Sequence, residues 1–206
     1  MPQIGPSLSP IMPSISSKAF FAAVLLAILS LASCTAITGG SVIRDIKERP
    51  ENGAFIEGVP FFPQDTAMCG PAALASVIGY WGTPASINDI AEKVYQEKLK
   101  GTLPIDMLLY AKELGYEASY YRGTLDDLKK RVMEKTPLII FIDTGYRFYP
   151  RGHYIVVTGY NEKMRMVTAH SAMNADEPFS YERLLNAWSK TDYSTLLVRP
   201  KPTGER

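Results

Sequence analysis

A single cysteine stands before a Gly-Pro pair in the stretch QDTAMCGPAALASVIGYWG, residues 64–82. Cys69 would lie in the first turn of an apolar helix, where the positive end of the helix dipole favours a thiolate and lowers the pKa of the thiol. Gly70 leaves room for a substrate carbonyl, and Pro71 suits a first turn because its missing N–H costs nothing there. The stretch therefore predicts a nucleophilic thiol, and a buried structural thiol is the alternative.

His153 opens a β-rich stretch, HYIVVTGY, and could serve as the base for that thiol. A cysteine with an imidazole is the minimum pair for covalent acyl transfer. Gln64 lies five residues before Cys69, and its side-chain amide could join the Cys69 backbone N–H in an oxyanion hole. These three residues are the predicted catalytic groups.

Other chemistries find little support in the composition. The chain has 2 histidines and 2 cysteines, too few at close spacing for a zinc site. No glycine-rich loop with a following lysine is present for phosphates. The net charge is +1 with both signs scattered, which gives no reason to expect nucleic acid. We therefore expect no metal and no cofactor.

The elements that must position these residues fall into two groups. Capped or proline-started helices are predicted over residues 71–82, 87–99, 105–115, 124–135 and 181–190. A short strand or an extended entry is predicted over residues 59–62, and strands are predicted over residues 117–123, 137–143, 153–160, 163–171 and 191–200. Because helices come first and a mainly antiparallel sheet follows, the predicted class is α+β.

The first residues read as an export signal. Lys18 precedes an apolar run of about fifteen residues, which is short for a membrane span and typical of a secretory leader. The run ends in LASC, which resembles the lipobox of bacterial lipoproteins. That resemblance implies a lipid on Cys34, cleavage just before it and, with Thr35 following, an outer-membrane location facing the periplasm. Met12 is an alternative start that gives a more usual leader.

The predicted organisation is a lipoprotein signal peptide over residues 1–33, a tether over 34–58, one domain over 59–200 and a polar tail over 201–206. Two alternatives remain for the leader: a plain secreted or single-anchor protein whose leader only happens to end in Cys, and an unprocessed protein with a Cys34–Cys69 disulfide. An exported protein meets oxidising conditions, and lipidation of Cys34 would leave no second cysteine to bridge with Cys69. A thiol kept under such conditions favours a functional role for Cys69.

The segments VPFFPQDTAMCGPAAL and GHYIVVTGYN together resemble the double-glycine leader peptidases, which are bacteriocin-processing, papain-like cysteine peptidases. The similarity is greatest to stand-alone C39-like lipoproteins without transporter domains, and it covers residues 59–199. It implies a papain-like fold with Cys69 as nucleophile on the central helix. It also implies His153 as general base across the cleft and Gln64 as oxyanion donor.

The chain departs from these relatives at one place. They usually carry an aspartate after the histidine to orient the imidazole, whereas here the strand reads MRMVTAHSAMN. Ser171 or His170 could take that part, and Asn174 or Asp176 could reach back from the following loop. A second open question is whether Tyr146, Phe148 and Tyr149 pack within their loop or grip a peptide.

The predicted function is an envelope-anchored thiol peptidase that cleaves peptide bonds through a cysteine thioester. Its partners would be a peptide or protein substrate and, through the lipid, a membrane. Transfer of the acyl group to an amine would use the same residues. The alternative is a catalytically impaired papain-like module that binds peptides in an envelope complex.

Overall fold

The computed structural model describes residues 37–64, 67–145 and 148–202. Its helices are α2 (Gly39–Glu48), the 3-10 turn η2 (Pro50–Asn52), α3 (Cys69–Tyr80), α4 (Ile87–Val94), α5 (Pro104–Glu113), α6 (Leu125–Met133) and α7 (Tyr181–Ser189). Its strands are β1 (Gly53–Phe55), β2 (Tyr95–Gln96), β3 (Gly101–Thr102), β4 (Glu117–Arg122), β5 (Leu138–Asp143), β6 (Gly152–Asn161), β7 (Met166–Ser171), β8 (Asn174–Ser180) and β9 (Ser194–Arg199). The predicted α+β class, with helices first and an antiparallel sheet later, is confirmed.

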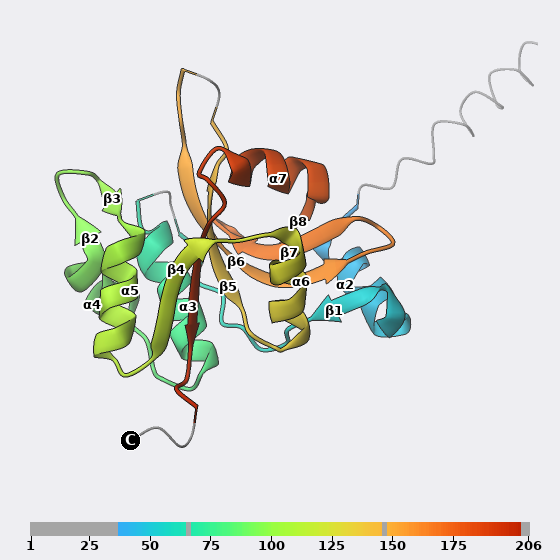
Figure 1. Ribbon diagram of the computed structural model, residues 1–206, viewed down its shortest axis with the longest axis horizontal. Helices are drawn as coiled ribbons and strands as arrows, with labels where there is room; N and C mark the ends of the chain where they lie inside the picture. Colours follow the sequence, from blue (N-terminus) through green and yellow to red (C-terminus); the bar gives the residue numbers. More distant parts are fainter. Residues whose placement is uncertain (1–36, 65–66, 146–147, 203–206) are drawn as a thin grey trace, which may run out of the picture. The chain divides into compact units, whose positions relative to one another are not determined.

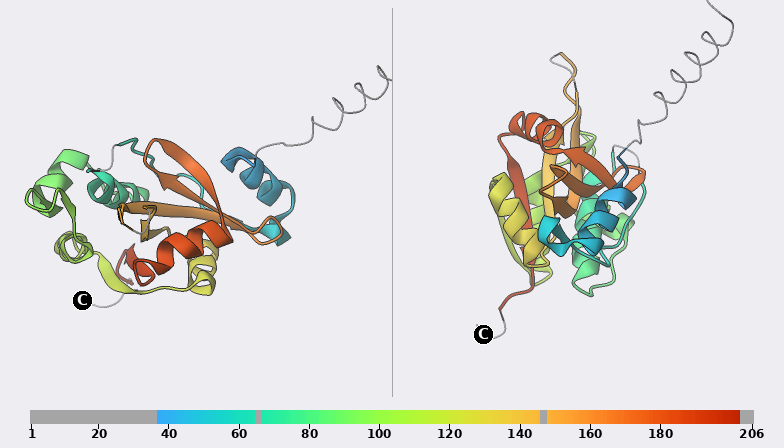
Figure 2. Two further views of the ribbon diagram at one scale, coloured as in Figure 1. Left: turned by 90° about the horizontal axis from the view of Figure 1, so that it is seen from above. Right: turned by 90° about the vertical axis from the view of Figure 1, so that its right-hand side faces the viewer.

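The main sheet runs in the order β4-β9-β5-β6-β7-β8, with β1 pairing beside β6. All of these pairings are antiparallel. Helices α6 and α7 lie on one face of the sheet, whereas α3, α4 and α5 lie on the other (Figures 1 and 2). The core therefore consists of two apolar layers that share the strands between them.

Helix α3 is the most buried helix of the domain. Every residue from Cys69 to Ile78 is buried, as expected for a run of small and aliphatic side chains packed between β6 and the helices α4 and α5. Three of the other helices begin at capping residues, because the side chains of Ser86, Thr124 and Ser180 each accept a hydrogen bond from the first turn that follows.

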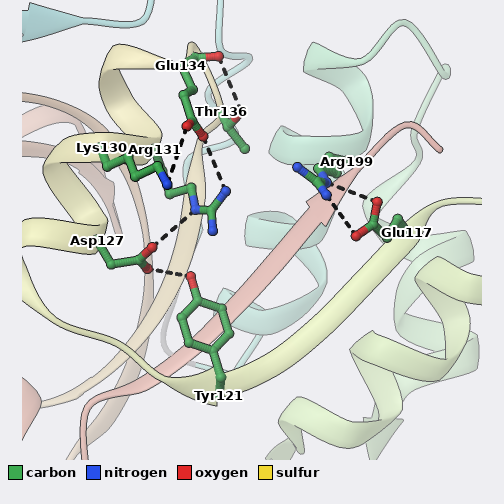
Figure 3. Close-up of polar contacts among 8 residues, drawn as sticks. All are labelled: Glu117, Tyr121, Asp127, Lys130, Arg131, Glu134, Thr136 and Arg199. Atoms are coloured by element: carbon green, nitrogen blue, oxygen red, sulfur yellow. Dashed lines mark hydrogen bonds and ion pairs between the residues drawn. The ribbon is translucent and has the colours of Figure 1, made fainter. Parts of the chain in front are cut away.

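A polar network ties the edge strand β4 to its neighbours. Arg199 on β9 donates to both carboxylate oxygens of Glu117, at 2.9 and 3.0 Å, and Tyr121 donates to Asp127 on α6 (Figure 3). Arg131 binds the same aspartate at 3.2 Å. Glu117 and Arg199 are also opposite each other in the β4–β9 pairing, so these contacts support the pairing of the edge strand.

The predicted tether over residues 34–58 was wrong where the structure describes it. Thr38 forms a capping box with Ser41 and starts α2, whose apolar face buries Val42 and Ile46. Asp45 on the same helix accepts hydrogen bonds from Asn161 and Asn52, each at 2.7 Å. Residues from Ile37 onward therefore belong to one compact unit. The sequence did not predict α2 because its short amphipathic period lies in a polar, glycine-containing stretch.

Three smaller predictions also need correction. The helix predicted over residues 87–99 ends at Val94, because the chain turns into the β2–β3 hairpin, where Gln96 donates to Asp106 at 2.9 Å. Residues 59–62 form no strand and pair with no described strand. Strand β8 was not predicted, since its residues NADEPFS have low strand propensity.

Several predictions concern residues outside the described ranges: the signal peptide over 1–33, the lipid site Cys34, and most of the polar tail over 201–206. Among residues 37–64, 67–145 and 148–202, no helix has the length and apolar character needed to cross a bilayer.

Candidate active site

Cys69 is the first residue of α3 and only 6% exposed. The preceding residue, Met68, supplies no side-chain cap. Pro71 lies in this turn as predicted. The N-terminus of the helix therefore places a partial positive charge beside the sulfur.

A cleft of about 580 Å³ opens at Cys69. Its remaining walls come from the β2–β3 hairpin and from the sheet: Ala67, Leu99, Lys100, Gly101, Thr102, Leu103, Phe141, Gly152 and Tyr154. The Tyr154 hydroxyl donates to the Thr102 carbonyl at 2.9 Å, which ties the hairpin to β6. Burial, and then the nearby charge of Cys69, raises the pKa of Tyr154, so this phenol stays protonated as a donor.

Gly70 allows the hairpin to approach the helix closely. A Cβ atom at this position would lie 2.6 Å from Cβ of Thr102, closer than two carbon atoms can pack. The Oγ1 atom of Thr102 is itself buried and has no hydrogen-bond partner among the described residues. Gly70 therefore lets the β2–β3 hairpin lie against the start of α3; its role in leaving room for a substrate carbonyl stays a prediction.

His153 lies near the start of β6, opposite Ile142 of β5, and is 7% exposed. Burial lowers the pKa of its imidazole; the charge of Glu177 raises that pKa and the charge of Arg151 lowers it further. At neutral pH the ring is therefore uncharged, which is the state required of a general base.

The hydroxyl of Ser171 contacts His153. Its Oγ atom lies 3.3 Å from Nε2 of the imidazole, and Ser171 itself is the last residue of β7. The register of β7 against β8 shifts between Ala169 and Ser171, and such an irregularity redirects side chains relative to a regular strand. Of the groups considered for orienting His153, Ser171 is the one that the structure brings to it.

The other three groups have different contacts. His170 makes hydrogen bonds with the Val59 carbonyl and with the backbone N–H of Asp176. The Asp176 carboxylate accepts from the Thr158 hydroxyl at 2.6 Å. Asn174 pairs with Ser171 in the β7–β8 register and is exposed.

Gln64 shares a hollow of about 460 Å³ with His153 and Ser171. Its backbone N–H donates to the Ala172 carbonyl at 3.2 Å, and its side-chain Oε1 is buried without a partner in the described part of the chain. Three of the predicted residues thus meet in one hollow. Cys69 opens the neighbouring cleft, which is lined by Gly152 and Tyr154, the residues on either side of His153.

Sequence reasoning missed Glu177, which lines the same hollow and is the carboxylate whose charge acts on His153. Glu177 also binds Arg183 at 3.2 Å. Because β8 was not predicted, nothing in the sequence placed this residue opposite Ala169 of β7. The described residues contain no group of three or more His, Cys, Asp or Glu side chains that could hold a metal ion.

The aromatic loop before His153 remains an open prediction. Phe148 and Tyr149 are 82% and 81% exposed, and Tyr146 lies outside the described residues. Neither Phe148 nor Tyr149 lines the cleft at Cys69 or the hollow at His153, so their contact with a substrate stays a prediction.

Comparison with solved structures supports the architecture. The peptidase domain of Streptococcus ComA, a bi-functional ABC transporter involved in a quorum sensing pathway, is 26% identical with a TM-score of 0.59, over 70% of this chain and 100% of that one. A double glycine motif protease from an AMS/PCAT transporter, solved in complex with the leader peptide, is 20% identical with a TM-score of 0.58, over 72% and 95% of the two chains.

Xylellain, a cysteine protease from Xylella fastidiosa, is 14% identical with a TM-score of 0.55, over 73% of this chain and 87% of that one. At their low identities, this structure and the AMS/PCAT protease support the papain-like fold alone. No curated protein matches this chain in sequence.

The family itself is identified by sequence. The pattern of the Peptidase C39-like family matches residues 56–196, a span that runs from the residues before Gln64 to strand β9 and includes Cys69, His153 and Ser171. The chain belongs to the Peptidase C39-like family of cysteine peptidases.

Proposed function

We propose that this protein is an envelope-anchored thiol peptidase that cleaves peptide bonds through a thioester at Cys69. The observation that carries the proposal is the contact of Ser171 with Nε2 of His153, in a hollow shared with Gln64 and next to the cleft of Cys69. The leader peptide bound to the AMS/PCAT protease supports a peptide as the substrate class.

The proposed reaction begins with a proton transfer from the Cys69 thiol to His153. Since Ser171 occupies Nε2, the proton goes to Nδ1. The thiolate then attacks the peptide carbonyl carbon, and the oxyanion receives hydrogen bonds from the Cys69 backbone N–H and the Gln64 amide. The buried Oε1 of Gln64 has no hydrogen-bond partner among the residues that the structure describes, and rotation of the amide exchanges this oxygen for the NH₂ donor.

His153 next gives its proton to the leaving amine, and the C–N bond breaks to leave the acyl group on the sulfur. Water attacks the thioester while His153 accepts one of its protons, and the acid leaves as the thiol is restored. An amine in place of water would give acyl transfer with the same residues.

The peptidase proposal is tested by alkylation with iodoacetamide between pH 5 and 9. We expect Cys69 to react faster than glutathione at pH 6, because the helix terminus and His153 favour its thiolate. His153→Ala should remove this faster reaction of Cys69. Ser194→Ala is the control and should keep it, because Ser194 on β9 is about as buried as His153. A rate profile for Cys69 identical to that of glutathione would refute the proposal.

A second candidate function is a peptide-binding module with impaired catalysis. It is favoured by one observation: the group in contact with His153 is a hydroxyl rather than the carboxylate usual among relatives. Cys69→Ser and Cys69→Ala separate the two functions in cells. An unchanged phenotype with both variants supports binding, and loss with both supports catalysis.

The anchor is a separate proposal that depends on the LASC sequence at residues 31–34. We expect metabolic labelling with a palmitate analogue to mark the wild-type protein in the outer-membrane fraction, and Cys34→Ala to abolish the label. Recovery of an unlabelled, soluble wild-type protein would refute the anchor without touching the peptidase proposal.

A further inference from the structure

His170 is a buried histidine that the proposed reaction does not use. It is 8% exposed, and both ring nitrogens are engaged by backbone groups. The Asp176 N–H donates to Nδ1 at 3.2 Å, and Nε2 lies 3.0 Å from the Val59 carbonyl. Because Nδ1 accepts, the proton must be on Nε2, which then donates to Val59. The surroundings therefore fix which ring nitrogen accepts and which donates.

The position of Asp176 is in turn fixed. Its carboxylate accepts from the Thr158 hydroxyl of β6 at 2.6 Å and lies 3.5 Å from Nδ1 of His170. Its backbone has φ of +50°, a left-handed conformation that aspartate tolerates better than most residues. A braced backbone N–H thus holds the ring of His170 in place.

His170 holds one end of the chain segment that runs from Val59 to Gln64. This segment pairs with no described strand, yet both of its ends are tied to the end of β7. Val59 is bound by His170, and the Gln64 N–H donates to the Ala172 carbonyl. In the middle, the Phe61 ring lies against the His170 ring with centroids 5.2 Å apart.

We infer that His170 is a positioning residue that sets where Gln64 stands in the oxyanion hole. It does so through the Val59–Gln64 segment, while its neighbour Ser171 orients His153. One turn at the end of β7 would then align two separate parts of the site. This inference rests on the proposed function, because it assigns His170 a role in the same acyl transfer.

Two substitutions at the same position separate the relevant hydrogen bond from mere packing. His170→Gln places an amide NH₂ near the position of Nε2 and can still donate to Val59. His170→Asn retains an acceptor near Nδ1 but does not reach Val59. A neutral hydrogen bond is worth roughly two- to twelvefold in an equilibrium or rate, so we expect His170→Asn to slow the reaction by up to about tenfold and His170→Gln to stay within about threefold of wild type.

The probe is p-nitrophenyl acetate, which acylates Cys69 and releases p-nitrophenol, with Cys69→Ala as background. Gln64→Ala should slow acylation by about tenfold, less than the hundredfold typical of amide substrates because an activated ester needs less oxyanion stabilisation. In the Gln64→Ala protein, His170→Asn should cause no further loss, since the group that it positions is already gone. Melting temperatures are measured for every variant.

The outcomes distinguish the two levels of the proposal. Additive losses from His170→Asn and Gln64→Ala, or a His170→Gln protein as slow as His170→Asn, would overturn the positioning role alone. A wild-type protein that reacts no faster than Cys69→Ala would overturn the proposed function. If His170→Asn does not fold, His170→Gln still decides, because a loss above about threefold in the presence of Gln64 contradicts the inference.

Discussion

Replacing Ser171 by alanine removes the hydroxyl that lies 3.3 Å from Nε2 of His153. This separation is at the long end of N–H···O distances, so the bond belongs to the lower part of the usual range, about 0.5–1 kcal/mol. The adjoining hollow of about 460 Å³ admits water, which can replace part of the lost bond. We therefore expect Ser171→Ala to reduce the rate of acylation by roughly two- to fivefold.

The assay is the release of p-nitrophenol from p-nitrophenyl acetate, followed against pH, with the melting temperature recorded alongside. Ser194→Ala is the matched control, since Ser194 is 5% exposed and Ser171 is 6% exposed. A Ser171→Ala protein with wild-type rate and pH profile would show that the hydroxyl does not orient His153. A loss above about a hundredfold would equally contradict the reasoning, because one long neutral hydrogen bond cannot supply it.

Three further predictions concern stability. Burial lowers the pKa of His153, so the unfolded chain binds the proton more readily, and the free energy of unfolding should fall as the pH drops below about 6.5. His153→Gln should flatten the plot of unfolding free energy against pH in this range. An equal slope in both proteins would contradict the burial argument. Glu117→Gln removes the contact of both carboxylate oxygens with Arg199 (Figure 3). Because the pair is exposed, the melting temperature should fall by only about 2 °C at low salt and by less in 1 M salt. A fall that does not depend on salt would count against an ionic origin. Gly70→Ala gains about 1 kcal/mol of helix propensity, but its Cβ atom would lie 2.6 Å from Cβ of Thr102. We therefore expect a net loss of ~1 kcal/mol in the free energy of unfolding, which Thr102→Gly should relieve. A stabilised Gly70→Ala protein would disprove the clash.

Much of the fold is readable from local signals. Ser86, Thr124 and Ser180 each precede a helical period and each caps a helix in the structure. The apolar runs of β5 and β6 predict buried strands, and in the structure both strands are buried over most of their length. Cys69 at a helix start and His153 at a strand start follow from the same local patterns.

The remainder depends on contacts between distant residues. Helix α2 is stabilised by Asp45, whose partner Asn161 is 116 residues away, so no local window predicts it. The choice between His170 and Ser171 depends on an irregular register at the end of β7. In a regular strand adjacent side chains point to opposite faces, and the sequence alone does not reveal where that alternation breaks.

The folding of α2 onto the domain shortens the link to the proposed lipid. Only four residues separate Cys34 from Gly39, where α2 begins, and fully extended they reach about 14 Å. A flexible tether of about 25 residues would instead have a root-mean-square end-to-end distance of about 27 Å. With the proposed lipid anchor, the domain would therefore stay in a thin layer next to the bilayer, where its effective concentration is high. Substrates would have to come to the membrane surface rather than be met in the open periplasm.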